Sequence, residues 1–140
     1  MPHLAATIPD GRERTSGARW FRLGCELVRV LRALPGIEVR RLTDGPAPLL
    51  KDLRERARYR RRRTAEERSD LRRVIRWADA HFPGGGNCYR RSLLEIALDA
   101  DSASEAFVMG LRSAGGDRSG HAWVGSAGAD GGLYDAIISL

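Results

Sequence analysis

The spacing of apolar residues changes near residue 105, and this change limits the folds that the chain can adopt. Before that point, apolar residues recur at every third or fourth position, which is the period of an amphipathic helix. Over 105–112 and again over 120–126 they alternate along the chain, which is the period of a half-buried strand. Helices followed by short strands predict an α+β fold, with N-terminal helices and a small antiparallel sheet.

Four helices are predicted before the strands, over about 15–34, 48–62, 65–82 and 87–98. The third is the clearest, because Thr64-Ala-Glu-Glu67 has the pattern of a capping box. Pro35-Gly36 is expected to end the first helix and to lead into a short extended piece over 37–42. The first helix is expected to bury an apolar stripe made of Trp20, Phe21, Gly24, Leu27, Val28, Leu31 and Leu34.

Three strands are predicted in the C-terminal part, over 105–112, 120–126 and 133–140. We expect loops over 99–104 and 113–119 and a hairpin turn over 128–132, so that the strands form a meander. For the whole chain we expect a flexible N-terminus over 1–14 and one domain over 15–140. Within that domain, 15–63 is the helical, arginine-rich part and 64–140 holds the functional core.

Composition excludes several classes of protein. The 140 residues are 42% hydrophobic and contain no apolar run long enough to span a membrane. The N-terminus lacks the apolar segment of a secretory signal, so we expect a cytoplasmic protein. Two cysteines and three scattered histidines offer no metal-binding spacing, so neither a metal nor another cofactor is expected.

The net charge is +6, and eleven of the arginines lie between Arg54 and Arg76. Such a segment attracts phosphate backbones, acidic peptides or acidic membrane surfaces. A solvated helix face is the more common reason for such a run. Nucleic-acid binding is the weaker alternative, because Tyr59 alone interleaves these arginines and provides no stacking platform.

Cys88 stands where chemistry is expected, directly after Gly84-Gly85-Gly86-Asn87 and at the start of a predicted helix. Free amides and the helix dipole favour a thiolate there, and the same amides suit a developing oxyanion. Gly86 and Asn87 then lie where a substrate backbone would approach. Cys25 lies inside the first predicted helix and is interpreted as a small buried hydrophobe.

His121 is the natural base for Cys88, and Trp123 points to the same side of its strand. Asp135 on the following strand would orient the imidazole, which completes a Cys-His-Asp triad. Each of these residues has an ordinary structural interpretation on its own, and the combination carries the hypothesis. A tight turn at Asp130-Gly131 would place His121 opposite Leu140, so the triad requires a wider loop near Gly128 or a bulge.

Three segments resemble the transglutaminase-like cysteine peptidases of lasso-peptide biosynthesis, over about the last half of the chain. They read Asn87-Cys-Tyr-Arg-Arg-Ser-Leu-Leu-Glu-Ile-Ala-Leu98, Ala106-Phe-Val-Met-Gly-Leu-Arg112 and Gly120-His-Ala-Trp-Val124. The resemblance implies a transglutaminase/papain-like core with its nucleophile at a helix N-terminus. It assigns Cys88, His121 and Asp135 to the triad, and it gives Arg91 a structural or substrate-orienting role.

The resemblance also implies a function, which is removal of the leader from a ribosomally made precursor peptide. Implied partners are that precursor, a small leader-recognition protein and an ATP-dependent cyclase. The same resemblance allows acyl transfer in place of hydrolysis. Two other hypotheses remain open from the sequence, namely an inactive transglutaminase-like module that binds a peptide or partner, and a basic nucleic-acid-binding protein.

Overall fold

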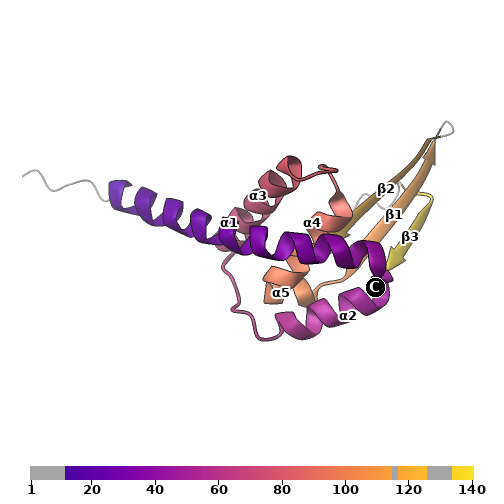
Figure 1. Ribbon diagram of the computed structural model, residues 1–140, viewed down its shortest axis with the longest axis horizontal. Coiled ribbons are helices and arrows are strands. Elements are labelled where there is room, and N and C mark those ends of the chain that lie inside the picture. Colours follow the sequence, from indigo (N-terminus) through magenta and orange to yellow (C-terminus); the bar gives the residue numbers. More distant parts are fainter. Residues whose placement is uncertain (1–11, 115–116, 126–133) are drawn as a thin grey trace, which may run out of the picture.

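The computed structural model describes residues 12–114, 117–125 and 134–140, and within them helices precede a three-stranded antiparallel sheet (Figure 1). The predicted α+β class is therefore confirmed. The elements in chain order are α1 (Arg12–Thr43), α2 (Pro46–Ala57), α3 (Ala65–His81), α4 (Cys88–Leu98), α5 (Ala100–Ser104), β1 (Phe107–Ala114), β2 (Asp117–Val124) and β3 (Ala136–Ser139). In the described ranges no helix combines the length and the apolar character needed to cross a bilayer.

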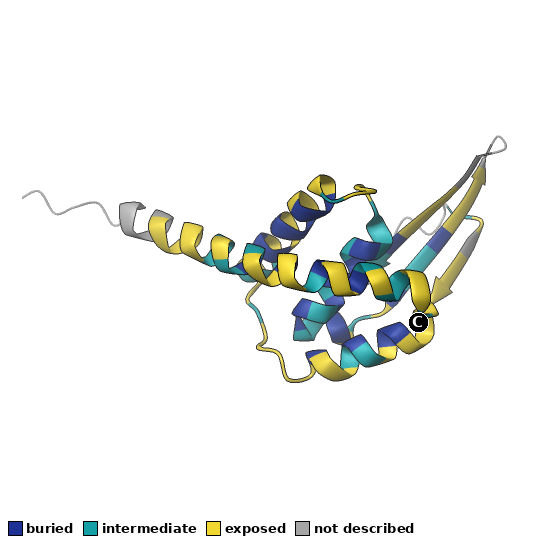
Figure 2. Cartoon of the chain, in the orientation of Figure 1, coloured by how far each residue is buried: buried dark blue, intermediate teal, exposed yellow. Residues whose placement is uncertain are grey.

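Helix α4 is the centre of the core, because it packs against α1, α2, α3, α5 and β2. Leu93, Leu94 and Ile96 of this helix are fully buried. Figure 2 shows the buried residues of the other helices on their inward sides. Because neighbours surround α4 on several sides, more of its residues are buried than one amphipathic stripe would supply.

The sheet has the strand order β2-β1-β3, so the expected meander is wrong. Gly110 of β1 lies opposite His121 of β2 on one side and opposite Ile137 of β3 on the other. Strands β2 and β3 are both antiparallel to β1 and thus parallel to each other, which requires a crossover connection of about a dozen residues. Residues 125–135 provide that length, although the expected turn over 128–132 lies outside the described residues.

Helix α1 does not end at Pro35, and the expected extended piece over 37–42 is helical instead. Pro35 is exposed, whereas Ile37 on the next turn is buried in the core. Glu38 also accepts a hydrogen bond from the buried Arg90. Packing and this ion pair outweigh the loss of one helical hydrogen bond at proline.

The expected buried stripe of α1 is wrong for most of its members. The core-facing residues of the helix are Val30, Leu34 and Ile37. Trp20 and Phe21 are 72% and 76% exposed. The N-terminal half of α1 projects beyond the other helices (Figure 1). Because α1 has apolar residues on two faces, periodicity alone did not identify the face that packs.

Three smaller differences concern element ends. Residues 100–104 form α5 and not a loop, because the Asp99 side chain accepts a hydrogen bond from the Ser102 amide and caps the helix. Strands β1 and β2 extend into the expected loop over 113–119 and pair as far as Ala114 opposite Asp117. Helix α2 covers 46–57, not 48–62, and is anchored by buried leucines at 49, 50 and 53.

The capping box of α3 is confirmed. The Thr64 hydroxyl accepts a hydrogen bond from the Glu67 amide at 3.2 Å, and the Glu67 carboxylate accepts one from the Thr64 amide at 2.8 Å. Arg61 pairs with the same carboxylate at 2.7 Å. The Thr64 amide and then the Arg61 guanidinium lower the pKa of Glu67 to about 2.

We therefore expect Glu67→Ala to lower the free energy of unfolding by about 1 kcal/mol at neutral pH. Because the pKa of Glu67 is lowered in the folded state, this contribution is complete above its ordinary value of 4.5 and is lost as the pH falls toward about 2. Urea unfolding at several pH values measures the difference. Glu66→Ala, at an exposed neighbour in the same turn, is the control, and a difference for Glu67→Ala that does not change with pH contradicts this account.

Candidate functional site

The turn between α3 and α4 presents Cys88 at the first position of a helix. Asn87 is the N-cap, and its side-chain oxygen accepts a hydrogen bond from the Arg90 amide at 2.9 Å. Gly86 has a φ of +81°, which favours glycine, and a Cβ on Gly85 would lie 2.8 Å from the Asp79 carbonyl oxygen. The glycines therefore allow a close turn at the end of α3, and the expected helix start is confirmed.

The buried side chain of Arg90 stabilises this turn. Its side chain is fully buried, and both Nε and Nη2 donate to Asp79 Oδ1 on α3. Nη1 donates to Glu38 of α1 at 3.1 Å. The remaining donors reach the carbonyl oxygens of Pro83 and Gly84 at 3.2 and 3.1 Å, so one guanidinium joins α1, α3, α4 and the turn.

Arg90 was not among the predicted site residues, whereas its neighbour Arg91 was. Arg91 is one-third exposed, and its Nε lies 3.5 Å from Asp79 Oδ2. A signal for Arg90 was present, because position 90 shares a helix face with Leu93, Leu94 and Ala97. An arginine on an apolar face needs buried carboxylates as partners, and Asp79 and Glu38 supply them.

The Cys88 thiol lies against the outer edge of β2. The Ala122 amide donates a hydrogen bond to Sγ at 3.3 Å, and Sγ lies 3.8 Å from the Gly120 carbonyl oxygen. Both groups point away from β1, since β2 is an edge strand of the sheet. The sulfur is therefore placed beside the backbone of His121, between its two chain neighbours.

The His121 side chain projects from the face of β2 opposite the one that carries the buried Ala122 and Val124. Its ring stacks on Trp123 at 5.7 Å and lies nearly parallel to Tyr134 at 6.5 Å between ring centroids. Tyr134 reaches this position by crossing Gly110, where an added Cβ would meet its ring at 2.6 Å. Tyr134 and Gly110 were not predicted as site residues, and Tyr134 stacks on the imidazole on this face of the sheet.

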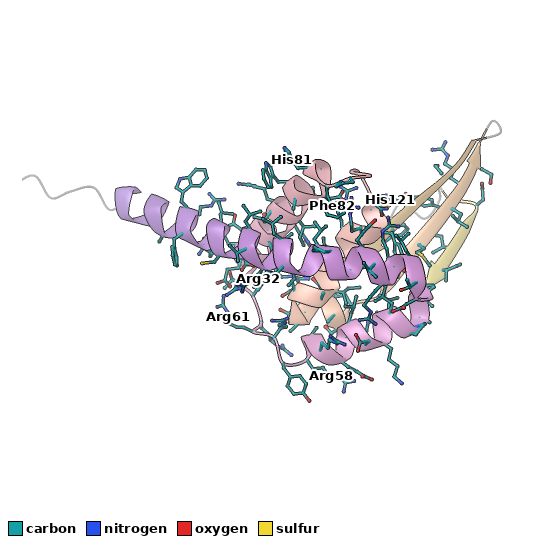
Figure 3. All side chains as sticks on the ribbon, in the orientation of Figure 1. Arg32, Arg58, Arg61, His81, Phe82 and His121 are labelled. Atoms are coloured by element: carbon teal, nitrogen blue, oxygen red, sulfur yellow. The ribbon has the colours of Figure 1, made fainter. Side chains whose placement is uncertain are left out.

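A groove of about 230 Å³ runs along the β2 edge and brings most of the predicted site together. Cys88, His121, Trp123 and Arg91 all line it. A second hollow on the other side of the thiol is lined by Gly86, Asn87, Cys88 and His121, among others. In Figure 3, His121 lies where the sheet meets α4. Six of the seven predicted site residues thus surround the same stretch of β2.

Asp135 is the one predicted site residue that does not line either hollow beside Cys88. Its carboxylate accepts a hydrogen bond from the Ser113 amide at 2.5 Å, and its own amide donates to the Leu111 carbonyl at 2.8 Å. Both partners belong to β1, which separates Asp135 from His121 on β2. The expectation that Asp135 would stand on the strand next to His121 is therefore wrong, because β3 pairs with the far edge of β1. Its role as third member of a triad stays a prediction.

The first turn of α4 supplies hydrogen-bond donors near the thiol. The amides of Arg90 and Arg91 are satisfied by the side chain and the carbonyl of Asn87. Within the described ranges, the amides of Cys88 and Tyr89 have no protein acceptor, as is usual for the first residues of a helix. The Tyr89 ring packs against Phe107, and burial raises the pKa of its phenol.

Much of the arginine-rich segment serves the fold. Arg63 pairs with the buried Glu26 at 3.0 Å, and Arg68 pairs with Glu105 and with the buried Asp99. Arg58 and Arg61 of this segment lie well away from His121 in Figure 3. The interpretation of the segment as a surface for an acidic ligand stays a prediction, and two of its arginines, Arg72 and Arg76, line the groove beside Cys88.

The described part of the chain contains no group of three or more histidine, cysteine or carboxylate side chains that could hold a metal ion. Comparisons of the chain with protein-family models, with curated proteins and with solved structures gave no match.

We expect Arg90→Met to lower the free energy of unfolding by about 3–5 kcal/mol, because it leaves the buried Asp79 carboxylate without its main partner. In the double variant, Asp79→Leu also removes that carboxylate, so part of the lost free energy of unfolding should be recovered. Urea unfolding at neutral pH measures both variants. Arg73→Gln, at an exposed position of α3, is the control and changes stability by less than about 0.5 kcal/mol. A loss in Arg90→Met no larger than that of the control would contradict the central role of Arg90.

Proposed function

We propose that the protein is a cysteine peptidase of transglutaminase-like type that removes the leader from a ribosomally synthesised precursor peptide. Cys88 is the nucleophile and His121 is the general base in this proposal. It acts in the cytoplasm, where the precursor is made. The family assignment comes from the resemblance of three segments, and the chemistry comes from the site itself.

One observation supports this proposal most. The Cys88 sulfur lies at a helix N-terminus and accepts a hydrogen bond from Ala122, so it stands directly beside the backbone of His121. The amide donor and the first-turn position fix the sulfur at the edge of β2. Thiol and imidazole also line one groove, in which a peptide carbonyl has access to both.

The proposed reaction begins with the transfer of the thiol proton to His121. The imidazole reaches the sulfur by rotating its side chain over the β2 edge, away from its stack with Trp123 and Tyr134. The thiolate then attacks the scissile carbonyl carbon, and the free amides of Cys88 and Tyr89 receive the oxyanion. His121 gives its proton to the leaving amine, and a thioester remains.

Water completes the cycle. His121 accepts a proton from the attacking water, the second tetrahedral intermediate collapses, and the thiol is released with the proton that His121 returns. An amine in place of water would give acyl transfer by the same steps. The precursor, a leader-recognition protein and an ATP-dependent cyclase are the partners that belong to this proposal.

Two other functions are distinguished by their dependence on Cys88. An inactive binding module would keep its peptide affinity and show no turnover in the wild-type protein. A nucleic-acid-binding protein would bind with a steep salt dependence that Cys88→Ala leaves unchanged. Neither is favoured by a specific observation, since many arginines of the basic segment already pair with carboxylates of the protein.

The test is cleavage of a peptide library, with new termini identified by mass spectrometry. We expect wild-type protein and Cys25→Ala to cleave, and Cys88→Ala and His121→Ala to lose at least about 10³-fold in rate, as removal of a nucleophile or base does. In parallel, iodoacetamide should alkylate Cys88 faster than Cys25 near pH 6, and His121→Ala should abolish this advantage. Equal alkylation of the two thiols in the wild-type protein, together with no cleavage, would refute the proposal.

Asp135→Asn tests the third member of the triad. Because the Asp135 carboxylate binds the Ser113 amide across β1 from His121, we expect cleavage to fall by no more than about tenfold. Because the imidazole leaves its stack with Tyr134 to reach the sulfur in this proposal, Tyr134→Ala should also keep cleavage within about tenfold of the wild type. Peptide cleavage at saturating and at limiting peptide measures both variants. A loss of about 10⁴-fold in Asp135→Asn would instead show that the carboxylate orients the imidazole during turnover.

A further inference from the structure

We propose that the groove beside Cys88 is a subsite for an acidic side chain, so that the peptidase selects peptides with a carboxylate next to the scissile bond. This inference rests on the proposed function for the meaning of the subsite, whereas its anion selectivity is a property of the groove alone. Arg76 and Arg91 are the selecting residues.

The groove is built from helices α3 and α4 on one side and the β2 edge on the other. Arg72 and Arg76 reach it from α3, and Arg91 reaches it from the first turn of α4. Ala122, Trp123 and Val124 form the opposite wall, and Cys88 lies in the same lining. A side chain that enters the groove is therefore adjacent to the thiol.

The side chains that line the groove carry a net positive charge. Glu95 is the carboxylate among the lining residues, and Arg72 pairs with it. Arg91 has one weak contact, in which its Nε lies 3.5 Å from an Asp79 carboxylate that Arg90 already occupies. Among the described residues no carboxylate lies within ion-pair distance of Arg76, which is exposed. Two guanidinium groups thus remain for a ligand, and both can bind a carboxylate through paired N–H donors.

The α4 N-terminus adds to the same selectivity. Its dipole and the free amides of Cys88 and Tyr89 favour negative charge within the first turn, which is where Arg91 stands. Another basic hollow, around Arg29, Arg60 and Arg63, differs in this respect. Arg29 and Arg63 there share the carboxylate of Glu26, and the hollow has no nucleophile.

The experiment compares two alkylating agents of similar size, the anionic iodoacetate and the neutral iodoacetamide. The ratio of their rates at Cys88 reports the local preference for an anion, with Cys25 in the same chain as the internal reference. We expect the ratio to be higher at Cys88 than at Cys25, and to fall about threefold in Arg76→Gln and in Arg91→Gln at low ionic strength. Added salt should reduce these differences.

Arg73→Gln is the matched control, because Arg73 is an exposed arginine of α3 that does not line the groove. Its rate ratio should equal that of the wild type. In the peptide library, bonds with aspartate or glutamate close to them should be cleaved faster than other bonds, and Arg76→Gln should reduce that difference.

The outcomes separate this inference from the proposed function. Cleavage without an acidic preference, with an unchanged rate ratio in Arg76→Gln and Arg91→Gln, would overturn the subsite and leave the peptidase in place. A rate ratio that depends on both arginines, in a protein that cleaves no peptide, would support an anion site and refute the peptidase. If Arg91→Gln disturbs the fold through its contact with Asp79, the result for Arg76→Gln alone decides whether the subsite exists.

Discussion

The buried ion pair between Arg90 and Asp79 is the interaction on which the rest of the structure depends. A guanidinium without solvent access is tolerated because all of its donors meet acceptors, from Asp79, Glu38 and two carbonyl groups of the glycine-rich turn. Through these contacts α1 and α3 hold the start of α4. Cys88 stands two residues before Arg90, so the position of the thiol is set by a charge pair that takes no part in the proposed chemistry.

The edge of β2 is the second constraint on the site. An edge strand has unpaired amides and carbonyls, and here the Cys88 sulfur occupies two of them, at Ala122 and Gly120. This contact explains why a thiol on a helix lies beside the backbone of a histidine on a strand. It also leaves one side of the strand open to the groove, where Arg76 has no carboxylate partner among the described residues and Arg91 has its 3.5 Å contact with Asp79.

Local sequence signals predicted several features correctly because their causes are local. The Thr64–Glu67 capping box, the start of α4 at Cys88 and the alternation of β1 and β2 each depend on residues within a few positions of one another. Asn87 caps the helix with its own side chain, and the glycines before it make the turn. For the same reason the local residue pattern is enough to identify Cys88 and His121 as candidates.

The order of helices and strands and the position of Cys88 at a helix start follow from the amino-acid sequence alone. Tertiary packing settles which face of α1 is buried, that this helix continues through Pro35, and that β3 lies beside β1. The reason is that these features depend on free energies of contact between distant segments, such as Glu38 with Arg90 and Asp135 with Ser113. Periodicity shows that a face is apolar, but the partner that covers it is set by the packing of the whole chain.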